Sequence, residues 1–150
     1  TLTGTNHPST SGYKQGGSIT ASEQTVATIT INTLGRDVLI LFNPTITATD
    51  VPEYNSVALF GEVSATIKIK KGSTIMATGN LYDDGKNFVG GSITALDTSP
   101  NGSLASAADT VYTCTLEINE FTTASVSGGV GYNKKAVTIG GTAIAVEMRV

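Results

Sequence analysis

Apolar and polar residues alternate along most of this chain in segments of strand length. The clearest case is residues 63–70, where Val63, Ala65, Ile67 and Ile69 alternate with serine, threonine and lysine. A period of two is typical of a β-strand that buries one face. Similar segments follow one another from Gly16 onward, separated by turn-forming sequences such as KKGS and DDGKN, and no segment shows a helical period. The pattern therefore predicts nine or ten strands.

Two segments carry more apolar residues than one buried face needs. Residues 38–42 read VLILF without interruption, a pattern expected of a strand that is covered on both faces. In the last segment, residues 143–150, we expect Ile144, Val146 and Met148 to face the core. The alternate positions Ala143 and Ala145 would then face outward and let another surface approach closely. A single sandwich has one inner face per sheet, so we expect a second copy of the chain to cover the excess, with interface residues Leu39, Leu41, Ala143 and Ala145.

The first fifteen residues, TLTGTNHPSTSGYKQ, show no period and contain turn formers. We interpret 1–15 as an extended N-terminal arm or linker and 16–150 as one domain. Many antiparallel strands in a domain of this size indicate an all-β sandwich, jelly roll or barrel.

Composition and charge argue against several functions. Nine Lys plus Arg against twelve Asp plus Glu give a net charge of −3, which offers no electrostatic footprint for nucleic acid. No apolar stretch approaches the roughly 20 residues of a membrane span, so we expect no membrane insertion. Charged residues make up only 14% of the chain, which is typical of β proteins that work on an outer surface or inside an assembly.

The residue types that carry enzyme chemistry are scarce. His7 is the single histidine and Cys114 the single cysteine, and Cys114 alternates inward like a core residue. Asp83 and Asp84 lie in a turn sequence, which explains them better than acid–base catalysis or calcium binding does. We therefore predict that the protein is not an enzyme and has no catalytic residue, cofactor or metal site.

Several segments together resemble the complement-head and tumour-necrosis-factor-like jelly rolls, above all those of bacteriophage fibre tips and virion surface proteins. These segments are RDVLILFNPTITA, SATIKIKKGSTIMATGNLY, ITALDTSP, DTVYTCTLEI and GGTAIAVEMRV. The resemblance covers about residues 16–150 and is one of pattern. It implies an antiparallel jelly-roll sandwich of about nine to ten strands, a tight homotrimer with Phe60 near its axis, and a terminal strand placed centrally in the inner sheet.

These observations favour a homotrimeric virion surface protein, either a capsid decoration (cement) protein or a fibre head. Residues 1–15 would attach it to the capsid or the fibre shaft. The loops 48–60 and 97–109 would face the host surface, where Tyr54, Asn55, Asn101 and Ser103 suit recognition of a glycan or a protein. One alternative is an extracellular filament or pilus subunit whose first residues add a strand to a neighbour. Another is a carbohydrate-binding module, although the chain has no tryptophan for a stacking platform.

Overall fold

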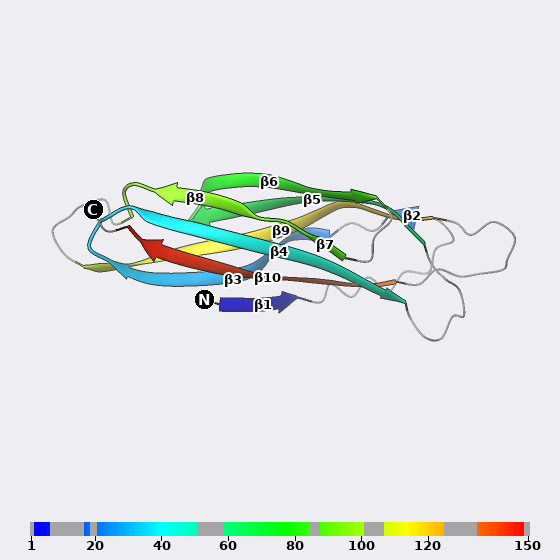
Figure 1. Ribbon diagram of the computed structural model, residues 1–150, viewed down its shortest axis with the longest axis horizontal. Helices are drawn as coiled ribbons and strands as arrows, with labels where there is room; N and C mark the ends of the chain where they lie inside the picture. The colour runs from blue at the N-terminus through cyan, green and yellow to red at the C-terminus, as the bar shows by residue number, and fades with distance from the viewer. Residues whose placement is uncertain are drawn as a thin grey trace, which may run out of the picture.

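The protein consists of two antiparallel β-sheets packed face to face in an elongated sandwich, seen in a computed structural model (Figure 1). The structure describes residues 2–6, 17–18, 21–50, 59–84, 88–100, 107–124 and 135–148. None of these residues lies in a helix, so none of them belongs to a helix that could cross a membrane. The all-β, two-sheet architecture expected from the alternation is thereby confirmed.

Ten strands are present in the described part of the chain, and each sheet contains five of them. Sheet A has the order β1-β10-β4, and β7 and β8 follow one another along the other edge of β4. In sheet B, β2 and β3 pair with one edge of β9, followed by β5 and β6 on the other side. The strands are β1 (Leu2–Asn6), β2 (Gly17–Ser18), β3 (Ala21–Thr33), β4 (Val38–Asp50), β5 (Leu59–Lys71), β6 (Thr74–Asp84), β7 (Phe88–Gly90), β8 (Ile93–Asp97), β9 (Ala108–Ala124) and β10 (Lys135–Glu147).

The core lies between the two sheets and is built from every second residue of the long strands. Sheet A contributes Val38, Ile40 and Phe42 from β4, all fully buried. Sheet B contributes the alternating residues expected from the sequence, among them Ile67 and Cys114. The remaining fully buried large side chains are Ile46, Ile69, Tyr112, Leu116, Ile118 and Ile139, with Val26 almost as deep.

The first part of β3 pairs irregularly with β9. The pairing of β3 with β9 shifts register between Ala21 and Gln24 and again between Thr25 and Ala27. A bulge places two consecutive residues of one strand opposite one residue of its partner. This explains why the neighbours Val26 and Ala27 are both buried.

The expected orientation of the last strand is wrong. Ala143 is completely buried and Ala145 packs against the core, whereas Ile144 is 39% exposed and Val146 50% exposed. The cause is the pairing of β10 with β4, which sets Ala143 opposite Phe42 and Ala145 opposite Ile40. Directly paired residues share a face of the sheet, so the alanines fill the small space left beside large β4 side chains and the larger residues of β10 face outward.

Among the described residues, β10 is paired on both edges only in its middle part. β10 pairs with β4 over its whole length and with β1 over Ile139–Ala143. Beyond β10, the Met148 amide donates to the carbonyl of Asp37 at 2.7 Å. Residues 2–6 of the expected arm thus form an edge strand, while residues 7–15 lie outside the described residues.

Candidate interaction surface

The outer face of sheet A carries a continuous set of apolar side chains at the end of the sandwich that holds the C-terminus. Leu39 of β4 lies directly between Leu96 of β8 and Val146 of β10, as the registers of both pairs show. The next row along the sheet places Leu41 opposite Ile144. We call this set the apolar outer face; its members are Leu39, Leu41, Leu96, Ile144, Val146 and Met148.

These side chains remain accessible in the described structure. Leu39 is 38% exposed, Leu96 52% and Met148 43%. Their exposed surface sums to on the order of 400 Å², which is the size of the largest apolar patch on a typical monomer, and such patches are often functional. The surplus of apolar residues in 38–42 and in the last strand therefore lies on one outer face.

The outer face of sheet B differs in chemistry. Its central rows are threonines and paired charges, because Glu23 accepts hydrogen bonds from Thr115 at 2.6 Å and Lys70 at 2.5 Å. These two hydrogen bonds, together with Lys68 nearby, hold the pKa of Glu23 below its ordinary value. Lys68 and Lys70 thus share one carboxylate on this face. Sheet B also exposes Ile75, Tyr82 and Val111, but each lies opposite a polar residue of the neighbouring strand. The continuous apolar surface therefore lies on sheet A.

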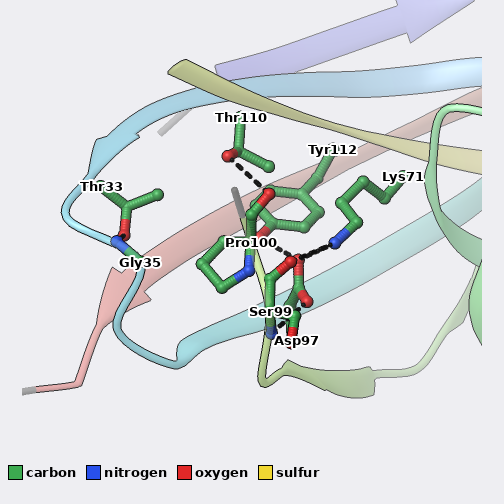
Figure 2. Close-up of polar contacts among 8 residues, drawn as sticks. All are labelled: Thr33, Gly35, Lys71, Asp97, Ser99, Pro100, Thr110 and Tyr112. Carbon is green, nitrogen blue, oxygen red and sulfur yellow. Dashed lines mark hydrogen bonds and ion pairs between the residues drawn. The ribbon is translucent and has the colours of Figure 1, made fainter. Parts of the chain in front are cut away.

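A buried polar cluster fixes the strand that carries Leu96. Asp97, the next residue of β8, points into the sandwich and is only 3% exposed (Figure 2). Its Oδ2 atom accepts hydrogen bonds from Tyr112 Oη and Lys71 Nζ, each at 2.7 Å, and its Oδ1 atom accepts one from the Ser99 amide at 3.0 Å. Tyr112 lies on β9 and Lys71 ends β5, so one carboxylate of sheet A is bonded to two strands of sheet B.

The electrostatics of this cluster favour an ionised Asp97. Burial by itself raises the pKa of a carboxyl group, but the bonds from Lys71, Tyr112 and the Ser99 amide outweigh it, and the pKa of Asp97 lies below its ordinary value. Burial and the adjacent carboxylate together raise the pKa of Tyr112. Tyr112 therefore acts as a neutral donor, and the cluster joins the two sheets through hydrogen bonds.

The neighbouring loop is fastened in the same region. Thr110 donates from its hydroxyl to the carbonyl of Pro100 at 3.2 Å, and Lys71 Nζ also donates to the carbonyl of Ser99 at 3.0 Å (Figure 2). In the turn between β3 and β4, the Gly35 amide donates to the Thr33 hydroxyl at 3.1 Å. These bonds hold the end of the sandwich on which the apolar outer face lies.

The structure places the residues predicted from the sequence in different parts of the molecule. Leu39 and Leu41 lie on the apolar outer face, as an interface requires. Ala143 is part of the protein's own core and Ala145 packs on it, so neither belongs to the outer face. Phe60 lies in β5, opposite Thr123, but its side chain is outside the described residues. The proposed host-facing residues Tyr54, Asn55, Asn101 and Ser103 also lie outside them.

Sequence reasoning missed Leu96 and assigned Ile144, Val146 and Met148 to the wrong face. Leu96 alternates with Ala95 and Asp97, and a strand with alanine and aspartate on one face gives no sign that this is the buried one. A signal was present in the volume of the neighbours: the large β4 residues inside leave room for alanines in the adjacent strand.

The described residues provide neither a cluster of metal ligands nor an accessible thiol. No group of three or more histidine, cysteine, aspartate or glutamate side chains among them could hold a metal ion. Cys114 is completely buried, and burial raises the pKa of its thiol to about 12. Comparison with protein-family models and with curated proteins returns no match to this chain.

Proposed function

We propose that this protein is a structural subunit that assembles with copies of itself through the apolar outer face of sheet A. The single observation that carries the proposal is the row Leu96–Leu39–Val146 on an accessible sheet surface. Burying about 400 Å² of apolar surface contributes about 10 kcal/mol from each of two copies before costs are counted. Lost translational and rotational freedom costs about 4–15 kcal/mol, and ordering of side chains costs more, so contacts around the patch also decide the affinity.

A second copy is the occupant that this surface suits best. A standard interface buries about 800 Å² on each partner, with an apolar centre and a polar rim. The apolar outer face would supply half of that area as the centre. Thr94, Asn43 and Thr142, which share the same face in the next positions of β8, β4 and β10, would supply part of the rim.

We further propose a jelly-roll topology and a virion role, following the family resemblance. The chain passes between the sheets at most of its connections: β1 to β2, β3 to β4, β4 to β5, β6 to β7, β8 to β9 and β9 to β10. Such crossings are typical of Greek-key and jelly-roll sandwiches. The position of β10 between β1 and β4 also agrees with the central terminal strand that the resemblance implies. On this basis the assembly is a homotrimer on a phage surface, as a capsid decoration protein or a fibre head. Other virion proteins, and a host glycan or protein, would be its partners.

Two matched valines test the self-association. Val146 lies on the apolar outer face and is 50% exposed, whereas Val111 lies on the outer face of sheet B and is 45% exposed. Native mass spectrometry should show an oligomer, ideally a trimer, for the unmodified chain and for Val111→Asp, and a folded monomer for Val146→Asp. A monomeric unmodified chain, or equal effects of the two substitutions, would overturn the proposal.

Electron microscopy of native particles with this protein labelled tests the virion role, and absence of label from every particle would contradict it.

A further inference from the structure

The edge of β10 that faces away from β4 is only partly covered. β1 pairs with Ile139–Ala143, five of the thirteen residues of β10. In the described part of the chain, no strand pairs with Ile144–Glu147 along this edge. Open strand edges readily accept another strand, because their backbone groups lack partners. In Figure 1, β1 lies at the margin of the sandwich, beside β10 and away from the other strands of its sheet.

The pairing of β1 with β10 includes two positions at which β10 has no side chain. Gly4 lies opposite Gly141 and Thr5 opposite Gly140, whereas Leu2 and Asn6 lie opposite the buried Ala143 and Ile139. At Gly141 a Cβ atom would lie 2.7 Å from the carbonyl oxygen of Asn43, which explains why this position of β10 has no side chain. Every copy of the chain presents the same register positions on its β10, so a neighbouring β10 offers β1 the same partners.

We propose that β1 is exchanged between copies, so that β1 of one subunit pairs with β10 of its neighbour in the assembly. The inference rests on the proposed self-association, because the apolar outer face includes Ile144 and Val146 of the same strand and would bring a neighbouring copy close to this edge. Exchanged strands make the same contacts as before, so exchange is a low-cost way to link subunits. Residues 7–16 connect β1 to β2 along the chain, and ten residues can span up to about 35 Å.

A pair of cysteines placed at one register position tests the exchange. Thr3 lies opposite Thr142, and directly opposed residues of antiparallel strands have Cα atoms about 4.5–5.5 Å apart, within the range of a disulfide. The chain with Thr3→Cys and the chain with Thr142→Cys are unfolded, mixed in equal amounts, refolded together and oxidised. The native Cys114 is completely buried and does not compete. A mixture of Thr3→Cys with Val111→Cys is the matched control, because Val111 lies on the opposite outer face.

Exchange predicts a covalent dimer of the Thr3→Cys and Thr142→Cys chains on a non-reducing denaturing gel, with its disulfide mapped by peptide mass, and no such band in the control. The chain carrying both cysteines should then form covalent oligomers. If the unmodified chain is an oligomer but the double variant links only within one chain and the mixture gives no dimer, the exchange is refuted while the proposed function stands. If the unmodified chain is a monomer, both are refuted.

Discussion

Replacing the buried carboxylate of Asp97 by an amide should destabilise the fold far more than replacing an exposed one. Asp97→Asn keeps the shape of the side chain but removes its charge. The amide group then presents hydrogens where Lys71 and Tyr112 require an acceptor. Both donors bond to Oδ2, so both lose their acceptor in that orientation. With the amide turned over, its oxygen accepts from both, but its NH2 group faces the Ser99 N–H instead. The ion pair with Lys71 is lost in either orientation.

The magnitude follows from the contacts. A hydrogen bond to a charged group contributes about 1.5–3 kcal/mol, and breaking a buried ion pair costs about 3–5 kcal/mol. The side chain of Lys71 is 29% exposed, so water partly solvates its ammonium group after the substitution and lowers the cost. We expect a loss of about 2–4 kcal/mol in the free energy of unfolding. At about 2–4 °C for each kcal/mol in a chain of this size, the melting temperature should fall by roughly 4–16 °C.

Urea unfolding followed by circular dichroism at one fixed protein concentration measures this loss, because self-association makes stability depend on concentration. Glu23→Gln is the matched control: its carboxylate also bonds to a lysine and a hydroxyl, but on the outer face of sheet B. Exposed pairs contribute about 0–1 kcal/mol. If Asp97→Asn loses no more free energy than Glu23→Gln, the Asp97 cluster does not cross-link the sheets as described.

Three further measurements follow from the same structure. The pKa of Asp97 lies below its ordinary value of 3.8, so the stabilisation by its carboxylate is complete above that pH and is lost as the pH falls through the lower, native pKa. The free energies of unfolding of the unmodified chain and of Asp97→Asn should therefore converge in acid. Curves that stay parallel would contradict the assignment. Gly79→Ala should cost about 1–3 kcal/mol, since its Cβ atom would lie 2.5 Å from Cγ2 of Ile93, and denaturant unfolding at wild-type stability would show that this contact relaxes freely. Native Cys114 should resist a thiol reagent at pH 8 and react at the rate of unfolding in urea, whereas immediate labelling would show an open path to the core.

Alternation along the strands was enough to predict most of the core of sheet B. Tyr112, Cys114, Leu116 and Ile118 are buried as their spacing indicates, because a strand with polar alternate positions has one stable orientation. The surplus in residues 38–42 was likewise visible in sequence: Val38, Ile40 and Phe42 fill the core and Leu39 remains exposed.

The last strand shows where such reasoning fails. Both of its faces are apolar, one with alanines and the other with Ile144 and Val146, so hydrophobicity alone does not choose between them. The choice depends on volume, because Phe42 and Ile40 of the paired strand occupy the space that larger residues of β10 would need. Packing density in a core penalises an extra methylene as well as a missing one.

By itself, then, the amino-acid sequence determined the all-β class, the strands and the existence of apolar surface in excess of one core, since these follow from local periodicity and composition. The tertiary structure alone decided which face of β10 is buried, that β8 places Leu96 beside Leu39, and that Asp97 joins Lys71 and Tyr112 between the sheets. Those features arise from contacts between strands far apart in the chain, whose register no local pattern contains.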